Sequence, residues 1–176
     1  FRSFIPVHFF DYVALSKPRV VSLVLLSTLV GFDLGLEGGV DLILLVTTLI
    51  ATVLVAVGSM ALNQLLECEI DRKMLRTQNR PLPAGRLRLR SALLFGVLTS
   101  AAGLSMFAVT GKNLSGLLAF ATLASYLAVY TPLKRNTSLA TLVGAVPGAL
   151  PILIGWTASG RALNVQAFVL FLVLFF

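Results

Sequence analysis

Five long apolar stretches constrain the fold more than any other feature of this sequence, and a sixth begins near its end. They cover residues 20–36, 42–66, 91–110, 114–131, 139–158 and 165–176. The first five approach the length of about 20 apolar residues that a membrane-spanning helix needs, and none has the polar face of a soluble amphipathic helix. We therefore predict an all-α polytopic transmembrane helix bundle with five complete spans and the start of a sixth.

The composition agrees with a chain that lies in a lipid bilayer. Hydrophobic residues make up 57% of the sequence and charged residues 12%, whereas soluble domains average about 45–50% and about 25%. These values exclude a disordered chain and a nucleic-acid-binding domain of the ordinary type, so we expect no nucleic-acid partner. The single cysteine, Cys68, excludes a disulfide scaffold.

The positive charges gather on one side of the predicted spans. Of the 14 lysine and arginine residues, all but Lys112 and Arg161 precede the first stretch, or lie between the second and third or the fourth and fifth. With alternating spans these segments share one side of the membrane, which the positive-inside rule places in the cytoplasm or the mitochondrial matrix. We expect the bacterial inner membrane, or the mitochondrial inner membrane in a eukaryote. The net charge of +7 is therefore largely a signal of orientation.

A polar stripe ends the second apolar stretch. Asn63, Glu67 and Asp71 follow one another at intervals of four residues, which places them along one side of a helix that we expect to continue to Arg76. Acidic groups at the end of an apolar span are costly unless they face a protein interior or a wet cavity. Their ligand atoms are all oxygen, which suits Mg²⁺ and not Zn²⁺. We therefore predict that these residues bind Mg²⁺.

Cations follow the stripe directly. Mg²⁺ in proteins usually keeps substrate phosphates among its ligands, and arginine and lysine neutralise the remaining phosphate oxygens. We predict a diphosphate site formed with Arg72, Lys73, Arg76 and Arg80. The alternative is structural: a helix end at the membrane surface whose acids and cations pair with each other.

A second polar cluster ends the fourth stretch. Tyr126, Tyr130 and Lys134 have the same spacing of four residues, Arg135 follows, and we expect Pro132 to distort the last turn. Lys134 and Arg135 could bind the same diphosphate from the opposite helix, and the tyrosines could shield a developing cation. The alternative is an aromatic belt at the interface with snorkelling cations.

These residues resemble the intramembrane prenyltransferases of the UbiA type. The resemblance lies in Asn63-Gln-Leu-Leu-Glu67-Cys-Glu69-Ile-Asp71-Arg72-Lys73-Met74 and the following Arg76-Thr77-Gln78-Asn79-Arg80-Pro81-Leu82-Pro83. Further matches are the segments 11–20, 130–135 and 148–160. The Arg-Thr-x-x-Arg-Pro-Leu run resembles the branch of the family that farnesylates heme, and the absence of an acid from residues 134–137 favours that branch over the quinone type. Glu67 departs from the family pattern, since an aspartate is usual there.

The resemblance implies a reaction and a larger enzyme. The substrates would be farnesyl diphosphate and heme B, the product heme O, and the cofactor Mg²⁺ held through Asn63, Glu67 and Asp71, with Tyr126 or Tyr130 shielding the allylic cation. Downstream partners would be a heme-modifying enzyme or oxidase assembly factors. The family has about nine helices, so we expect residues 1–176 to be a single prenyltransferase domain truncated at its C-terminal end and inactive alone. The alternatives are transfer to an aromatic quinone precursor, and a small membrane transporter subunit.

Overall fold

The structure, a computed structural model, describes residues 7–134 and 137–176, and every regular element within these ranges is helical. Five helical segments are long and apolar enough to cross a membrane, as the sequence predicts, and the protein is an integral membrane protein. The elements are α1 (Val7–Ser16), α2 (Pro18–Gly35), α3 (Leu42–Lys73), α4 (Leu89–Val109), α5 (Asn113–Ala124), η1 (Ser125–Tyr130), α6 (Thr131–Leu133), α7 (Ala140–Ala158) and α8 (Val165–Phe175).

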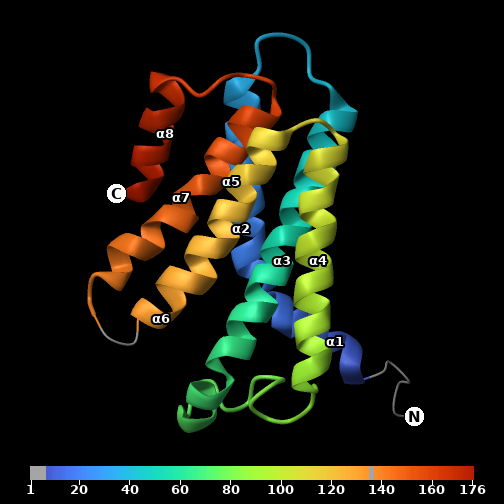
Figure 1. The fold of residues 1–176 in the computed structure, drawn as a ribbon, viewed down its shortest axis with the longest axis vertical. Helices are drawn as coiled ribbons and strands as arrows, with labels where there is room; N and C mark the ends of the chain where they lie inside the picture. Colours follow the sequence, from blue (N-terminus) through green and yellow to red (C-terminus); the bar gives the residue numbers. More distant parts are fainter. Residues whose placement is uncertain (1–6, 135–136) are drawn as a thin grey trace.

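The long helices run up and down in one bundle (Figure 1). α3 packs along α4, while α7 packs against α2, α5 and α8. The short helix α1, the α3–α4 loop and α6 all lie toward the lower end in this view, and the α2–α3 connection lies at the upper end. The three cation-bearing segments therefore share one end of the bundle, as predicted from the charge pattern.

Glycine allows α2 and α7 to approach closely. A Cβ added at Gly155 would lie 1.9 Å from the carbonyl oxygen of Thr28, and one at Gly31 would lie 2.0 Å from that of Ile152. No larger residue fits at either position without moving a helix. Small residues at helix contacts are how membrane helices gain van der Waals packing, because lipid supplies no hydrophobic force between them.

Two helix boundaries differ from those predicted. The second span does not continue to Arg76: α3 ends at Lys73, and Met74 caps it with an extended backbone at φ −100° and ψ 124°. The backbone then enters a series of turns, which explains why the helical spacing of the acids does not extend to the following cations. The first span begins at Pro18 and not at residue 20, and Lys17 separates it from α1. Proline is tolerated in the first turn of a helix because the N–H that it lacks would have no partner there.

The fourth span is not a regular α-helix at its lower end. η1 is a π-helical segment, and the Thr131 N–H bonds to the carbonyl oxygen of Tyr126, five residues earlier. Pro132 follows directly; its ring lacks an N–H and would clash with the carbonyl four residues before it in a regular helix. The wider turn relieves that clash. The predicted distortion is confirmed, and it begins upstream of the proline.

Candidate active site at the lower end of the bundle

The acidic stripe of α3 faces the protein interior. Asn63, Glu67 and Asp71 are 0%, 7% and 4% exposed, whereas Glu69, on the far side of the helix, is exposed. Buried carboxylates need partners, and each of the two has one. The stripe is therefore part of the packed bundle and not a solvated helix end.

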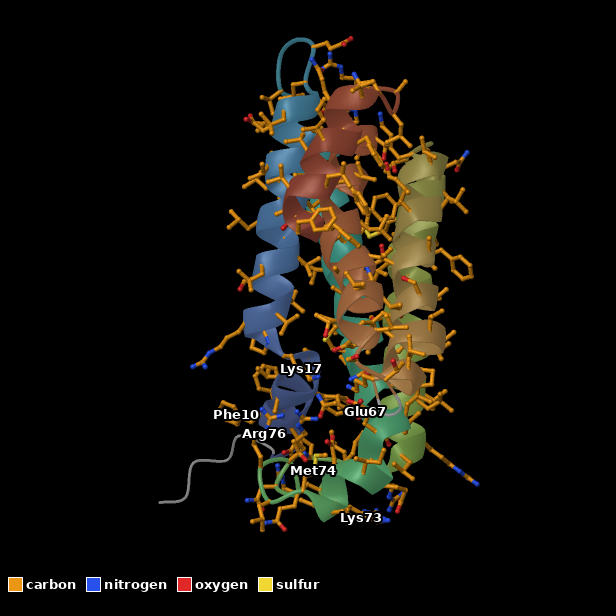
Figure 2. All side chains as sticks on the ribbon, turned by 90° about the vertical axis from the view of Figure 1, so that its left-hand side faces the viewer. Phe10, Lys17, Glu67, Lys73, Met74 and Arg76 are labelled. Carbon is orange, nitrogen blue, oxygen red and sulfur yellow. The ribbon has the colours of Figure 1, made fainter. Side chains whose placement is uncertain are left out.

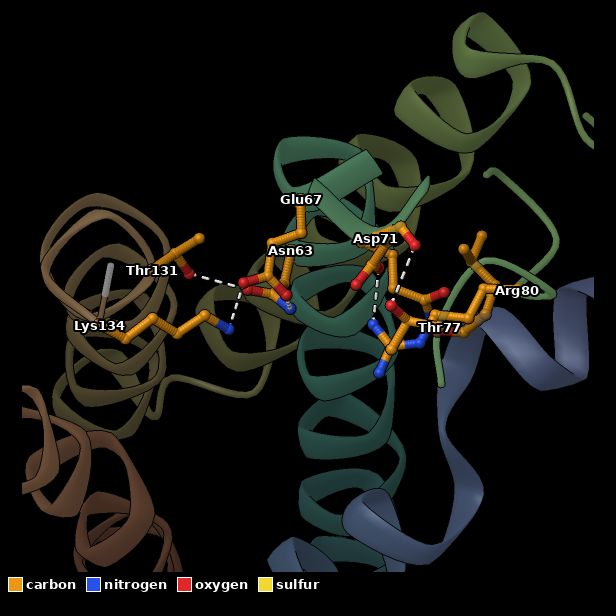
Figure 3. A network of polar contacts seen from close by, with 9 residues as sticks. Asn63, Glu67, Asp71, Thr77, Arg80, Thr131 and Lys134 are labelled. Atoms are coloured by element: carbon orange, nitrogen blue, oxygen red, sulfur yellow. Dashed lines mark hydrogen bonds and ion pairs between the residues drawn. The ribbon is translucent and has the colours of Figure 1, made fainter. Parts of the chain in front are cut away.

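Glu67 is held by residues from two helical segments (Figure 3). The Asn63 side-chain amide donates to Oε2 of Glu67 at 2.9 Å, and Lys134, which follows α6, forms an ion pair with Oε1. The hydroxyl oxygen of Thr131, at the start of α6, lies 2.8 Å from Oδ1 of Asn63 and donates to it. The two sequence clusters, near residues 63–71 and 126–134, thus meet at this carboxylate.

Asp71 is paired with the loop that follows α3. Nη1 of Arg80 lies 2.7 Å from Oδ2 of Asp71, and the Thr77 hydroxyl donates to the Asp71 carbonyl oxygen at 3.1 Å. The loop folds back because Leu82, which is 1% exposed, packs into the core beside Leu15 of α1. The packing of Leu82 thereby holds Arg80, which lies nine residues after Asp71 in the sequence, against the acidic stripe.

Lys17 is a further candidate site residue, although in the sequence it is only one of the cations that indicate the membrane orientation. Its backbone is left-handed, with φ 48°, a strained conformation for a residue other than glycine. Burial lowers the pKa of Lys17, and the nearby Arg80 lowers it further, while Glu67 and Asp71 raise it. A lysine at the start of a helix also opposes the helix dipole, which is the signal that could have identified it.

A polar pocket lies between α1 and the α3–α4 loop. It has a volume of about 390 Å³, and Figure 2 shows Lys17 and Arg76 toward this end of the molecule, near Glu67. Its polar lining consists of Lys17, Gln64, Arg76, Asn79, Arg80 and Arg86. Arg86 is tied to α1 by an ion pair with Asp11 at 2.8 Å. Cations therefore border Asp71 on the side away from Lys134.

Two predicted diphosphate ligands, Arg72 and Lys73, are not brought to this centre. Arg72 pairs with the exposed Glu69 at 2.9 Å and is itself exposed. Lys73 is exposed and points away from Glu67 at the tip of α3 (Figure 2). Arg135 lies outside the described residues. Among the described residues, the predicted cations that face the stripe or the adjoining pocket are Arg76, Arg80 and Lys134.

The two tyrosines of the second cluster form one aromatic surface. The rings of Tyr126 and Tyr130 stack with centroids 5.4 Å apart, and Nζ of Lys134 lies 5.4 Å from the Tyr130 centroid. Both tyrosines and Lys134 line an open pocket of about 520 Å³. Both tyrosines are half-buried.

An apolar cavity begins at Tyr126 and continues into the bundle. Its volume is about 150 Å³, and α2, α3, α5, η1 and α7 contribute its walls. Tyr126 and Gly144 line both this cavity and the open polar pocket. The residues that enclose it are Val20, Val24, Thr52, Val55, Ala56, Ser59, Met60, Ala119, Thr122, Leu123, Tyr126, Gly144, Pro147, Gly148, Pro151 and Ile154. An apolar chain in the cavity would have a polar head group among the cations.

The donor set fits a Mg²⁺ ion that is completed by its substrate. Among the described residues no group of three or more His, Cys, Asp or Glu side chains could hold a metal ion, so these side chains do not form a protein-only metal cage. Mg²⁺ is commonly bound by one or two carboxylates together with substrate phosphates. Glu67 and Asp71, one helical turn apart, with cations at hand for phosphate oxygens, match that arrangement.

Comparison with known proteins identifies the family. The sequence matches the UbiA prenyltransferase family over residues 24–176. The chain belongs to this family. It is 45% identical over 174 residues to a protoheme IX farnesyltransferase of Solibacter usitatus, and 43% identical over 172 residues to one of Legionella pneumophila strain Corby. These alignments cover 94% and 97% of this chain, and 60% and 58% of the relatives.

Solved structures share the fold of this UbiA member. A structure described as digeranylgeranylglyceryl phosphate synthase has a TM-score of 0.81 at 18% identity, covering 95% of this chain and 58% of that chain. A UbiA homolog from Archaeoglobus fulgidus, bound to DMAPP and Mg²⁺, has a TM-score of 0.75 at 21% identity, covering 94% and 60%. The chain thus spans about three-fifths of the length of the proteins it matches.

Proposed function

We propose that the protein containing this chain transfers the farnesyl group of farnesyl diphosphate to a vinyl group of heme B, giving heme O. The observation that carries this proposal is the pairing of Glu67 with Lys134 and of Asp71 with Arg80 along one face of α3. Lys134 lines the open pocket that shares Tyr126 and Gly144 with the apolar cavity. The names of the relatives, protoheme IX farnesyltransferases at 43–45% identity, support heme as the acceptor.

The paired charges suit a diphosphate site. Lys134 and Arg80 compensate the two buried carboxylates in the absence of ligand. Glu67 and Asp71 would hold the metal of a metal–diphosphate complex, and Lys134 and Arg80, beside them, would neutralise phosphate oxygens. Arg76 and Lys17 border the adjoining pocket and add positive charge. Charge stabilisation of this kind favours departure of the diphosphate.

Glu67 and Asp71 are the side chains that would hold Mg²⁺, with Asn63 beside them. When bound, the ion acts as a Lewis acid that stabilises negative charge on the departing diphosphate. The chain's own residues have three further roles. They bind the head group at the polar end, enclose the prenyl chain in apolar surroundings, and keep water away from its reacting carbon.

The bond changes follow from this arrangement. The allylic C–O bond breaks, and the diphosphate leaves with the electron pair. The stacked rings of Tyr126 and Tyr130 stabilise the allylic cation through their π faces. The heme vinyl group gives its π electrons to the allylic carbon, which forms the new C–C bond and leaves a cation on the other vinyl carbon. Water adds to that cation and releases one proton to the solvent or the departed diphosphate, which gives the hydroxyethylfarnesyl product. The remaining helices of a full-length relative would supply the heme contacts.

Transfer to an aromatic quinone precursor is the alternative within the same family. The second cation-bearing loop has lysine, arginine, asparagine and threonine at residues 134–137 and no acid, and the curated relatives are named for heme farnesylation. Both observations favour heme. A transporter subunit is disfavoured because the acids lie at the end of the bundle beside arginines, whereas transporter ion sites lie near the midplane.

The decisive experiment is pigment analysis of bacterial membranes. The full-length gene is expressed in a host that lacks its own heme O synthase, and extracted hemes are separated by chromatography. We expect heme O with the natural sequence and at most about 1% of that amount with Asp71→Asn, in line with losses of about 10²–10³ on removing one stabilising group. Equal membrane levels of both proteins are the control. A prenylated quinone precursor in place of heme O would support the alternative acceptor, and normal heme O formation by Asp71→Asn would contradict the assignment of Asp71.

A further inference from the structure

We propose that Thr131 is a positioning residue of this site: its hydroxyl orients the Asn63 amide, and the amide holds the Glu67 carboxylate ready for a metal–diphosphate complex. This inference rests on the proposed function, since it assigns Thr131 a part in the same site. Thr131 itself touches neither carboxylate.

The hydroxyl of Thr131 is available for Asn63. Thr131 is 1% exposed, and its Oγ1 lies 2.8 Å from Oδ1 of Asn63 and also 2.8 Å from the carbonyl oxygen of Tyr126. A hydroxyl has one proton to donate. The Tyr126 carbonyl already accepts the Thr131 backbone N–H through the π-helical turn, so it is satisfied without the hydroxyl. The Asn63 oxygen is then the acceptor that needs the proton.

The contacts on both sides of Asn63 fix the same orientation of its amide. Asn63 is 0% exposed. The Thr131 hydroxyl donates a hydrogen bond, so the Asn63 amide oxygen must lie on the side of Thr131. The Glu67 carboxylate accepts a hydrogen bond, so the Asn63 amide nitrogen must lie on the side of Glu67, where it is 2.9 Å from Oε2. A rotated amide would set its oxygen against a carboxylate in a buried place, which is costly. Thr131 thereby removes one of the two orientations that an asparagine side chain has.

The chain of contacts from Thr131 through Asn63 to Glu67, called the relay below, compensates for the length of the Glu67 side chain. Glutamate has one more rotatable bond than aspartate, so a glutamate at residue 67 needs more restraint to present its oxygens in one place. Asn63 binds Oε2 and Lys134 binds Oε1, so each oxygen has its own partner. Thr131 and Lys134 both come from the segment after η1, and the π-helical turn directs both toward α3 (Figure 3).

The test measures metal–diphosphate binding and not turnover alone. In the full-length protein, Thr131→Val removes the hydroxyl at nearly the same volume, and Thr131→Ser keeps it. Binding of Mn²⁺ with inorganic diphosphate is followed by electron paramagnetic resonance, with Mn²⁺ as the spectroscopic stand-in for Mg²⁺. We expect Thr131→Val to raise the dissociation constant about ten- to hundredfold, the usual effect of removing a group that orients a metal ligand. Thr131→Ser should stay within about threefold of the natural protein.

A matched control is Thr28→Val. Thr28 is as buried as Thr131, at 0% exposed, but its hydroxyl donates to the carbonyl oxygen of Val24 in its own helix, away from the acidic stripe. We expect natural Mn²⁺–diphosphate affinity in this variant. Natural Mn²⁺–diphosphate affinity in Thr131→Val, or equal losses of affinity in Thr131→Val and Thr131→Ser, would overturn the role of Thr131 and leave the proposed function standing. Absence of Mn²⁺–diphosphate binding by the natural protein would overturn the proposed function as well.

A double-mutant cycle tests whether Thr131 acts through Asn63. Residues that act in one chain of contacts show non-additive losses. We therefore expect that adding Thr131→Val to Asn63→Ala causes no further loss of Mn²⁺–diphosphate affinity beyond about twofold. A further loss as large as that of Thr131→Val alone would show that Thr131 acts independently of Asn63 and would overturn the relay.

Discussion

At the scale of single residues, the site depends on contacts that no spacing in the sequence reveals. The four-residue spacing of Asn63, Glu67 and Asp71 correctly indicates that they share one face of a helix, because helical geometry is local. Thr131 belongs to another helix and Lys17 to the α1–α2 junction, and their approach to the stripe depends on how the helices pack. Spacing could therefore predict the stripe but not its partners.

Lys17 shows strain and charge burial in the same residue. Its φ of 48° is unfavourable for any side chain with a Cβ, and burial lowers its pKa. A lowered lysine pKa means that the fold disfavours the protonated form. The charge therefore costs stability, in full below the lowered pKa, and the cost declines as the pH rises from the lowered value to the ordinary lysine pKa, where it disappears. An anion bound beside Lys17 would reverse this cost, which indicates a residue kept for binding and not for stability.

We predict that Lys17→Gly stabilises the ligand-free protein and weakens anion binding. Glycine adopts a positive φ freely, so we expect a gain of about 1 kcal/mol in unfolding free energy. The midpoint of thermal unfolding in detergent should rise by about 2–4 °C, while affinity for inorganic diphosphate with Mg²⁺ falls about tenfold, as expected for loss of about 1.4 kcal/mol.

The matched control for this prediction is Lys112→Gly at the other end of the bundle. Lys112 also precedes a helix, but its φ is −91°, so glycine relieves no strain there. We expect a small loss of stability and unchanged diphosphate affinity. A Lys17→Gly protein with unchanged affinity would show that Lys17 has no part in the site.

At the scale of elements, the spans could be predicted and their irregular ends could not. Lipid requires long apolar segments with internally bonded backbones, so the apolar stretches mark α2, α3, α4, α5 and α7 directly. Pro132 correctly indicates a distorted turn, but a proline leaves open whether the helix kinks, ends or widens. The structure adopts the π-helical turn of η1, because this turn keeps the Thr131 N–H bonded to the Tyr126 carbonyl.

The apolar cavity has a floor formed by three helices. Val55 of α3, Ala119 of α5 and Ile154 of α7 line it and also belong to one buried cluster. Val55 precedes Glu67 by three turns of α3, a distance of about 18 Å at the α-helical rise. A prenyl chain anchored at the acidic stripe would therefore extend toward this floor.

We predict that Ala119→Leu shifts the preference from farnesyl toward geranyl diphosphate. Ala119 is 1% exposed, and the larger side chain would fill the floor of the cavity. Overfilling an apolar site costs about 1–3 kcal/mol, so we expect the ratio of transfer rates for farnesyl over geranyl diphosphate to fall about tenfold or more in a competition assay. The exposed Ala101 on α4 provides the control substitution Ala101→Leu. An unchanged ratio in Ala119→Leu would mean that the prenyl chain does not reach this floor.

At the scale of the whole molecule, the charges of the chain and its candidate site lie at the same end. α1, the α3–α4 loop and α6 all lie toward this end (Figure 1). The loop contains Arg76 and Arg80, Lys17 directly follows α1, and Lys134 directly follows α6. The cations that set the orientation of the chain are thus partly the ones that would bind a diphosphate. The side of the membrane on which the loop lies therefore decides from which compartment the diphosphate substrate enters.

The orientation can be tested with single cysteines placed at the two ends. Cys68 is the one cysteine of residues 1–176 and is 3% exposed, so Cys68→Ala, with any cysteine outside these residues also replaced, gives a background without reactive thiols. Gln78→Cys lies in the exposed α3–α4 loop, and Gly38→Cys lies in the α2–α3 connection, where a Cβ meets nothing within 4 Å. Because positively charged loops remain in the cytoplasm, we expect a membrane-impermeant maleimide to label Gly38→Cys on intact spheroplasts and Gln78→Cys only in inside-out vesicles. The thiol-free background should stay unlabelled in both preparations. Labelling of Gln78→Cys on intact spheroplasts would place the acidic stripe on the outer side, and a cytoplasmic prenyl diphosphate could then not reach it directly.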